Sequence, residues 1–232
     1  MLPFNDFEVL TFDCYGTLID WESGILGALN PVLDAHGIHL EKERLLELYA
    51  EFEPLQQRGG YRNYKSILAS VVKGIGEQLD FTPTPSEQSS LSESIKQWQP
   101  FPDTVAALQS LHSKYKLAII SNIDNDLFAF TERHLKTKFD WVVTAEQVQS
   151  YKPSENNFLK AIERMQIPRE RILHVAQSVF HDIVPAKKLG ISTVWVKRRQ
   201  SGKGHGATPP ASMKADVEVQ DLRLLVDLIG LK

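Results

Sequence analysis

Residues 9–19 carry the residue types of a reactive site at the end of a strand. The largely apolar run Val9–Phe12 predicts a buried strand that leads directly into Asp13. A carboxylate at the carboxyl end of a hydrophobic strand is costly to desolvate, which indicates chemistry in preference to packing. Gly16 lets the chain turn away, so that backbone N–H groups can face the carboxylate. A strand-end cap is the alternative role for Asp13.

Three later segments end in polar residues of reactive types. They are Ser121 and Asn122 after an apolar run, Lys152 before a proline, and Ser178, His181 and Asp182 after another apolar run. A hydroxyl and exposed N–H groups suit the planar oxygens of a small carboxylate, and a histidine can donate a proton to a basic leaving group. Each residue also has a structural alternative. Ser121, Asn122 and His181 are all typical of helix caps, and a lone lysine before a proline is usually solvated.

From Pro100 onward the pattern predicts alternating strands and helices. The expected strands are Lys116–Ile120, Trp141–Thr144, Ile172–Ala176 and Thr193–Val196, and the expected helices are Asp103–Ser113, Asn125–Leu135, Ser154–Met165, Asp182–Leu189 and Leu222–Ile229. Such alternation is typical of a mostly parallel sheet with helices on both faces, to which Val9–Phe12 also belongs. Because ligands bind at the carboxyl ends of strands in these sheets, we expect the polar segments to meet there.

Residues 20–98 have a helical period in two stretches, at 45–55 and 61–75, and after a break at 81–85 they predict a further helix, so we expect an all-helical insertion. Thr84 and Glu87 form a capping box that opens a helix reaching about Trp98. We therefore expect a discontinuous α/β core domain, residues 1–19 and 99–232, and a helical cap domain, residues 20–98. The composition of residues 200–212 predicts a surface connector.

Bulk properties are those of an ordinary globular protein. The 232 residues are 42% hydrophobic and 24% charged, and the net charge of −3 gives no reason to expect a nucleic-acid or membrane partner. The first residues lack the pattern of a secretory signal, and no apolar run approaches transmembrane length. The single cysteine, Cys14, excludes an internal disulfide and fits a reducing cytoplasm.

Taken together, the four segments resemble the motifs of the haloacid dehalogenase (HAD) superfamily over essentially the whole chain. The resemblance implies a HAD-like Rossmannoid core, a doubly wound parallel sheet, with an inserted helical cap. Most phosphatases of the superfamily carry a second aspartate two residues after the first, where this chain has Tyr15. Asp-x-Tyr-Gly-Thr is similar instead to the L-2-haloacid dehalogenases, which attack carbon. Dimers are common among those enzymes, which makes a homodimer an expectation here.

The resemblance also implies a role for each motif residue. Asp13 is the nucleophile, Lys152 stabilises it, and Asp182 orients Lys152 or the hydrolytic water. Thr17, Ser121 and Asn122 hold the substrate carboxylate, and Ser178 and His181 belong to the substrate-binding side of the fourth motif. With Tyr15 and Gln177 at positions that are acidic in phosphatases, the Mg²⁺ cluster is depleted. We expect a metal-independent enzyme without a cofactor.

Two departures from the dehalogenases leave the substrate open. The cap stretch Leu48–Phe52 lacks the arginine that reaches the halide, and Phe158 replaces a tyrosine. A small 2-substituted carboxylate is expected, either an (S)-2-haloacid or the strained ring of L-azetidine-2-carboxylate, with Tyr15, Trp21 and Phe158 among the aromatic candidates for its pocket. A Mg²⁺-dependent phosphatase and a non-catalytic binding protein are the alternatives from other classes.

Overall fold

A six-stranded parallel sheet forms the centre of the computed structural model, which describes residues 2–198 and 206–231. The strands are β1 (Val9–Phe12), β2 (Lys116–Ser121), β3 (Trp141–Thr144), β4 (Ile172–Ala176), β5 (Ser192–Val196) and β6 (Val217–Val219), in the spatial order β3-β2-β1-β4-β5-β6. All four residues of β1 are buried, and this strand pairs in parallel with β2 and β4. The predicted α/β fold is confirmed.

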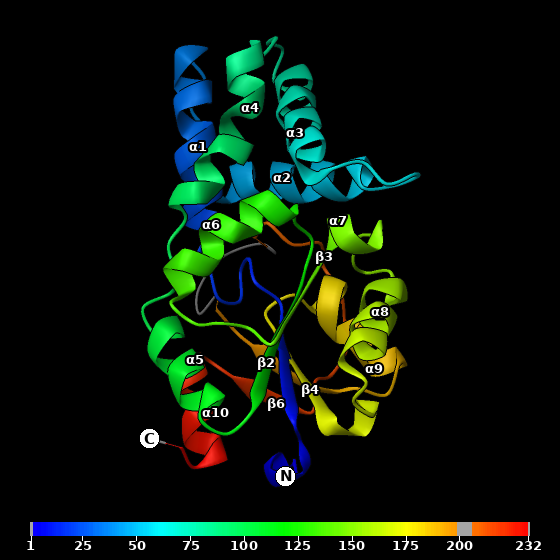
Figure 1. Cartoon of the computed structure of the whole chain (residues 1–232). Coiled ribbons are helices and arrows are strands. Elements are labelled where there is room, and N and C mark those ends of the chain that lie inside the picture. The colour runs from blue at the N-terminus through cyan, green and yellow to red at the C-terminus, as the bar shows by residue number, and fades with distance from the viewer. Residues whose placement is uncertain (1, 199–205, 232) are drawn as a thin grey trace.

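Helices cover both faces of the sheet, as the alternating pattern predicted. They are α5 (Thr104–His112), α6 (Asn125–Leu135), α7 (Ala145–Val148), α8 (Glu155–Met165), α9 (Val184–Lys188) and α10 (Leu222–Ile229). In Figure 1, α5 and α10 lie on one side of the strands, and α8 and α9 lie on the other. The carboxyl ends of the strands point away from the N-terminus, toward the helical insertion.

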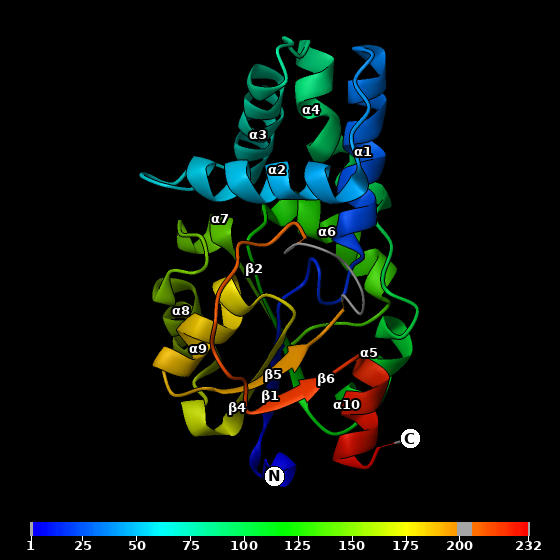
Figure 2. The same ribbon diagram turned by 180° about the vertical axis from the view of Figure 1, so that it is seen from behind.

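The insertion between β1 and α5 is helical, as predicted. It consists of α1 (Trp21–Ala35), α2 (Lys42–Gln56), α3 (Tyr64–Gln78), α4 (Pro85–Ser94) and the 3-10 turn η2 (Ile95–Gln97). The predicted capping box at Thr84 and Glu87 is present at the start of α4. Helix α2 runs across the insertion on the side of the core, and α1, α3 and α4 extend from it (Figure 2). We propose residues 20–98 as a cap domain over the core formed by residues 1–19 and 99–232.

Several elements differ from the sequence-based prediction, among them strand β6 and the helix after β4. Strand β6 was not predicted, because three residues with the pattern Val-Glu-Val carry too short a signal; it is placed by its pairing with β5. The helix predicted over Asp182–Leu189 begins earlier, as the π-helical turn η4 (Val179–Ile183), and continues as α9. The hydroxyl of Ser178 caps this turn by accepting from the N–H of His181.

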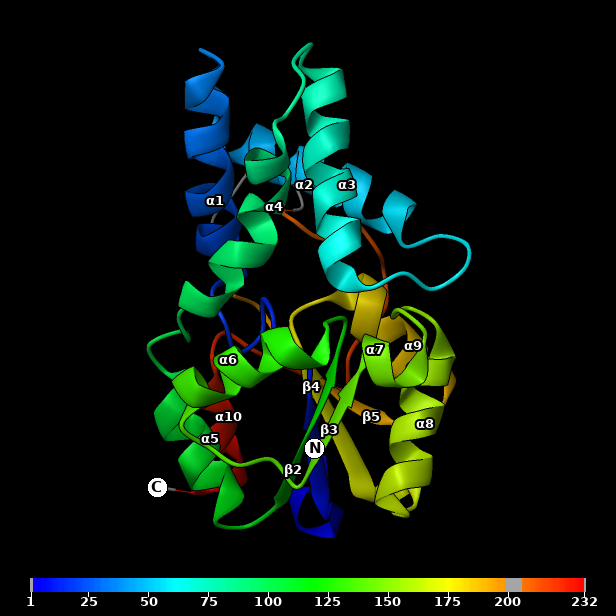
Figure 3. The ribbon, with the colours of Figure 1, turned by 45° about the horizontal axis from the view of Figure 1, so that its top comes forward.

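Figure 3 shows α6 lying at the foot of α4, where the insertion meets the core. Within the described part of the chain, no helix has both the length and the apolar character needed to cross a membrane. Of the predicted connector at 200–212, residues 200–205 lie outside the described residues. The part that is described includes Ala207 and Thr208, which are buried and not on the surface. A loop that composition placed at the surface therefore returns to the interior at these two residues.

Candidate active site

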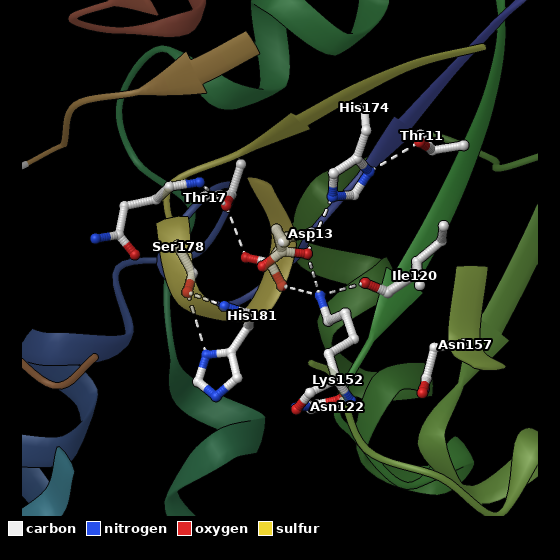
Figure 4. Close-up of polar contacts among 12 residues, drawn as sticks. Thr11, Asp13, Thr17, Ile120, Asn122, Lys152, Asn157, His174, Ser178 and His181 are labelled. Atoms are coloured by element: carbon white, nitrogen blue, oxygen red, sulfur yellow. Dashed lines mark hydrogen bonds and ion pairs between the residues drawn. The ribbon is translucent and has the colours of Figure 1, made fainter. Parts of the chain in front are cut away.

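Four polar segments converge at the carboxyl ends of the central strands. Asp13 follows β1, Ser121 ends β2, and Asp182 lies in the turn after β4. Lys152 comes from the segment between α7 and α8. The close-up in Figure 4 shows the side chains of Asp13 and Lys152 pointing toward each other from these different elements. The expected meeting of the polar segments is therefore present in the structure.

Lys152 is the centre of the cluster. Its Nζ donates to Asp13 Oδ1 at 2.9 Å, to Asp182 Oδ1 at 2.7 Å and to the carbonyl oxygen of Ile120 at 2.8 Å. An ammonium has three N–H bonds, so these contacts use all of them. The Lys152 side chain is 1% exposed. A fully buried ammonium shared between two carboxylates stabilises their negative charge, and that is the condition under which a carboxylate can act as a nucleophile at neutral pH.

A second set of contacts orients the two carboxylates. The Thr17 hydroxyl donates to Asp13 Oδ2 at 2.7 Å and accepts from the Gln177 backbone N–H at 2.9 Å. The ring of His174 lies between Asp182 Oδ1, 3.0 Å from Nε2, and the hydroxyl of Thr11, 2.8 Å from Nδ1. Thr17 was predicted to hold the substrate carboxylate. The structure places its hydroxyl on the nucleophile instead, because the turn after β1 folds it back toward Asp13.

The glycine of the first motif meets a steric requirement. Gly16 has a φ of +93°, and a Cβ built on it would lie 2.7 Å from Nε1 of Trp21. Only glycine adopts this backbone conformation without strain, and only glycine leaves room for the indole. The turn that carries Thr17 toward Asp13 therefore depends on the missing side chain at position 16.

Burial and the shared Lys152 ammonium set the protonation states of Asp13 and Asp182. Burial raises the pKa of Asp13, and the charge of Asp182 adds to this effect, whereas Lys152 and Thr17 oppose it. Burial acts in the same direction on Asp182, but there Lys152 and His174 outweigh it and lower the pKa of that carboxyl. Burial lowers the pKa of Lys152, and the two carboxylates outweigh it, so that the pKa of the ammonium is raised. Lys152 stays protonated as a result.

The Asn122 side chain bonds to the backbone of Lys152. Its Nδ2 donates to the Lys152 carbonyl at 3.0 Å, and its Oδ1 accepts from the Lys152 backbone N–H at 2.7 Å. The amide therefore holds the segment that carries the lysine. These contacts give the Asn122 side chain a positioning role; the residue also lines the cavity described below, and its part in binding the substrate carboxylate stays a prediction. The hydroxyl of Ser121, in contrast, is buried without a hydrogen-bond partner among the described residues and lines the cavity described below.

Ser178 contacts both the backbone and the ring of His181. The Ser178 hydroxyl oxygen accepts from the His181 backbone N–H at 2.9 Å, and it lies 3.2 Å from Nδ1 of the same residue. When the hydroxyl donates its proton to Nδ1, the ring proton lies on Nε2. That Nε2 is buried and has no partner in the described structure. Burial lowers the pKa of His181 to about 4, so at neutral pH it is an uncharged N–H donor.

A small cavity of about 30 Å³ joins these groups to the cap. Its lining comprises Asp13, Tyr15, Trp21, Glu53, Tyr64, Ser121, Asn122, Lys152, Gln177, Ser178, His181, Asp182 and Thr208. Tyr15 and Trp21 line it as predicted. Phe158 does not line the cavity. Its ring packs edge-on against His174, with ring centroids 5.0 Å apart, in a cluster of buried apolar residues that includes Ala161 and Met165 of α8. Position 158 follows the motif lysine in sequence, but α8 directs it away from the cavity.

Glu53, on α2 of the insertion, is a cavity residue that sequence reasoning missed. Its Oε1 accepts from the Tyr64 hydroxyl at 3.1 Å and from Gln57 Nε2 at 2.6 Å, while Oε2 is buried without a partner in the described structure. Burial raises the pKa of Glu53 to about 7, and Lys152 partly opposes this. The signal in the sequence was an acidic residue four positions after Tyr49, on the apolar face of a helix.

The residues present do not fit a magnesium site. Magnesium prefers near-octahedral oxygen ligands, usually from more than one carboxylate. Asp13 and Asp182 share the ammonium of Lys152, and the hydroxyl of Tyr15 is bonded to Thr131 Oγ1 at 2.7 Å. Within residues 2–198 and 206–231, no group of three or more His, Cys, Asp or Glu side chains is arranged to hold a metal ion.

A nucleophile-type aspartate at the end of β1 with a buried lysine beside it, under a helical insertion, defines a hydrolase site of the HAD kind. Residues 7–190 match the family model described as haloacid dehalogenase-like hydrolase. The chain belongs to this family, and it is a hydrolase.

Relatives of known activity cover nearly the whole chain. It is 27% identical over 221 residues to (S)-2-haloacid dehalogenase H-109 of Pseudomonas putida, spanning 92% of this chain and 96% of that one. It is 30% identical over 201 residues to glyceraldehyde 3-phosphate phosphatase of Methanothermobacter thermautotrophicus, spanning 82% and 85%.

Solved structures agree on the fold. The L-2-haloacid dehalogenase of Xanthobacter autotrophicus superposes with a TM-score of 0.80 at 20% identity, over 97% of this chain and 98% of that one. The predicted resemblance to the L-2-haloacid dehalogenases within the HAD superfamily is confirmed.

Proposed function

We propose that this hydrolase acts on a small 2-substituted carboxylate by attack of Asp13 on a saturated carbon. The observation that carries the proposal is the ion pair of Asp13 with Lys152, 2.9 Å long, at the wall of a cavity where Tyr15 stands in place of a second aspartate. An Asp13 oxygen forms a bond to C2 while the bond from C2 to its substituent breaks, and the leaving group departs with the bonding electrons. Attack from the opposite side inverts C2.

Water completes the reaction. It attacks the carboxyl carbon of Asp13, the bond from that carbon to the ester oxygen breaks, and the 2-hydroxy acid leaves as the Asp13 carboxylate is restored. Asp182 Oδ2 is buried, lines the cavity and has no partner among the described residues. This oxygen is suited to accept a proton from the attacking water while Lys152 holds the other oxygen of the same carboxylate.

The substrate carboxylate needs hydrogen-bond donors on the same wall. The unpartnered hydroxyl of Ser121 and the Nε2–H of His181 supply two, and both residues line the cavity. Tyr15 and Trp21 add apolar area beside them, which excludes water and limits the substrate to a small one. Figure 4 shows His181 held by Ser178 on the side of Asp13 away from Thr11.

Two substrates suit this chemistry: an (S)-2-haloacid and L-azetidine-2-carboxylate. The first is supported by the names of the (S)-2-haloacid dehalogenases that share 26–27% of their residues with this chain. One solved structure of the Xanthobacter autotrophicus enzyme has chloropropionic acid covalently bound. The second is supported by the absence of an arginine from Leu48–Phe52, where a halide-binding residue would be placed.

The first experiment incubates the purified protein, with a chelator present, with each enantiomer of 2-chloropropionate and of azetidine-2-carboxylate, followed by proton NMR. Turnover of one enantiomer to an inverted 2-hydroxy acid is the expected result. A single turnover in H₂¹⁸O, with mass spectrometry of the peptide that contains Asp13, then tests the ester: ¹⁸O is expected in Asp13. Label found only in the product would contradict the proposal.

A Mg²⁺-dependent phosphatase is the second candidate function, favoured by the 30% identity to the glyceraldehyde 3-phosphate phosphatase. If the protein hydrolyses a small phosphate ester, and if the chelator abolishes this activity and Mg²⁺ restores it, the phosphatase function replaces the proposed attack on carbon. We also propose a reducing cytoplasm as the compartment, which the single, buried Cys14 supports, and a homodimer, which the resemblance to the dehalogenases supports.

A further inference from the structure

The cap contributes an acidic side chain to the cavity, and one of its oxygens is bonded to none of the described residues. Glu53 is 3% exposed, and its Oε2 has no hydrogen-bond partner in the described structure. Of the cavity residues, Asp13, Glu53 and Asp182 are acidic, and Lys152 alone is basic apart from His181. With His181 uncharged, an ionised Glu53 leaves the lining with an excess of negative charge. A buried charge without a partner is costly, so the cavity is built for a positive group.

Lys152 cannot supply that positive group. Its three N–H bonds go to Asp13, Asp182 and the Ile120 carbonyl, as described above. The charge of Lys152 lowers the pKa of Glu53, but burial raises the same pKa by more. Among the residues that the structure describes, no other cation lines the cavity, so we place the counter-charge for Glu53 on the molecule that enters it.

Glu53 is also held in place for this purpose. The Tyr64 hydroxyl donates to its Oε1, so the Tyr49 hydroxyl, 2.9 Å from that of Tyr64, must donate in turn to Tyr64. The start of α3 is fixed to the core, because Asp124 accepts from the backbone N–H of Tyr64 at 2.7 Å. A chain of hydrogen bonds thus runs from the core through the cap to Glu53. Such preorganisation is typical of a recognition group.

We infer that Glu53 is a specificity-determining residue that pairs with a protonated amine at C2 of the substrate, which makes a cyclic 2-amino acid with a strained ring the substrate class of this site. The inference rests on the proposed function. It places the substrate between Glu53 on the cap and Asp13 on the core, with the substrate carboxylate on Ser121 and His181. A halide would leave as an anion toward the same carboxylate, which repels it.

The step balances without a co-reactant. Asp13 Oδ bonds to C2 while the C2–N bond of the ring breaks, and the nitrogen keeps the bonding pair. The ring nitrogen enters as an ammonium with two hydrogens and becomes a neutral primary amine on the opened chain. Water then hydrolyses the ester, and the proton that it releases goes to the amine. The product is an ω-amino-2-hydroxy acid, and Glu53 faces a cationic nitrogen before and after the reaction.

The test compares Glu53→Gln with Glu51→Gln, the same change on the exposed face of the same helix. The kcat/KM is measured for L-azetidine-2-carboxylate and for (S)-2-chloropropionate. A charge-assisted hydrogen bond of about 3 kcal/mol predicts that Glu53→Gln lowers kcat/KM for L-azetidine-2-carboxylate by about 100-fold. In Glu53→Gln the kcat/KM for (S)-2-chloropropionate should be unchanged or higher. Glu51→Gln should have the kcat/KM of the parent on both substrates. Equal losses on both substrates, or a parent that uses only the chloride, would overturn the inference and leave the proposed function standing.

A binding measurement keeps the inference testable if the parent turns over neither substrate, which is the failure of the proposed function. Calorimetric titration compares L-azetidine-2-carboxylate with oxetane-2-carboxylate, in which oxygen replaces the ring nitrogen. At least tenfold tighter binding of the amine, lost in Glu53→Gln, supports Glu53 as the amine-binding group. Equal binding of the two rings, or a preference unchanged in a Glu53→Gln protein that melts as cooperatively as the parent, overturns it.

Discussion

The ammonium of Lys152 lies 2.9 Å from Oδ1 of Asp13, although the two residues are 139 positions apart in the chain. The same nitrogen lies 2.7 Å from Asp182, and all three side chains are buried. Two carboxylates this close together are stable in the interior only with the cation between them. The contact that prepares the nucleophile is therefore also a contact that the fold needs.

Removing that cation should cost both stability and activity. We expect Lys152→Met to lose turnover and to lower the free energy of unfolding by about 3–5 kcal/mol at pH 7, because it leaves two buried carboxylates without the cation that they share. Urea unfolding measures the loss, and it should shrink at pH 4 as a carboxylate takes up a proton. The exposed Lys160, paired only with Glu163 at the surface, gives the control Lys160→Met, for which a change below about 1 kcal/mol is expected.

Neutralising the nucleophile separates chemistry from folding. Asp13→Asn should abolish turnover and the incorporation of ¹⁸O into residue 13, while the protein remains folded, because the amide oxygen still accepts from Lys152 and the NH₂ group can donate to the hydroxyl oxygen of Thr17. Mass spectrometry and thermal melting measure the two effects. Turnover within tenfold of the parent would show that Asp13 is not the nucleophile and would favour a binding protein or another reactive group.

His181 should make the protein sensitive to mild acid. Burial lowers the pKa of His181 to about 4 from an ordinary value of 6.5, so the unfolded chain binds a proton in this range and the native state does not. The contribution of His181 to the free energy of unfolding is therefore complete above pH 6.5, and it falls by at most about 3 kcal/mol as the pH drops toward 4. Urea unfolding of His181→Gln between pH 4 and 7 should have a smaller slope than the parent. Identical slopes would contradict the buried, neutral histidine.

Glu53 should act in the opposite pH direction. Burial raises the pKa of Glu53 from 4.5 to about 7, so the native state holds a proton that the unfolded chain has lost. Stability is greatest below pH 4.5 for this group and declines as the pH rises through 7, again by at most about 3 kcal/mol. Glu53→Gln should therefore be more stable than the parent at pH 8. If it is less stable at every pH, Glu53 has a counter-charge that the structure does not show.

Gly16→Ala tests the turn of the first motif. The added Cβ would lie 2.7 Å from Nε1 of Trp21, in a backbone conformation that alanine rarely adopts. We expect a loss of about 1–3 kcal/mol and a shift in the tryptophan fluorescence as the indole is displaced. Gly27→Ala is the matched control, because a Cβ there meets nothing within 4 Å and alanine favours the helix. Its stability should equal or exceed that of the parent.

The order of strands and helices could be predicted from the chain because hydrophobic periodicity is local. The runs that became β1, β3 and β4 were predicted with their observed limits, and those of β1 and β4 are bounded by polar residues on both sides. The three-residue β6 was missed because its pairing with β5, and not its own composition, makes it a strand. The start of η4 was missed for a similar reason: the cap supplied by Ser178 decides it.

The site shows the same division between sequence and structure. Four motifs in the sequence, through their resemblance to those of the HAD superfamily, predicted that Asp13, Lys152 and Asp182 belong to one reactive centre and that Tyr15 replaces an acidic neighbour. Only the tertiary structure decided which atoms face which. It turned Thr17 to the nucleophile, tied Asn122 to the Lys152 backbone and directed Phe158 behind the sheet. It also brought Glu53 from the cap into the cavity. Motifs encode chemistry by residue type, whereas the direction of a side chain and the charge of a cavity depend on packing between segments that are distant in the chain.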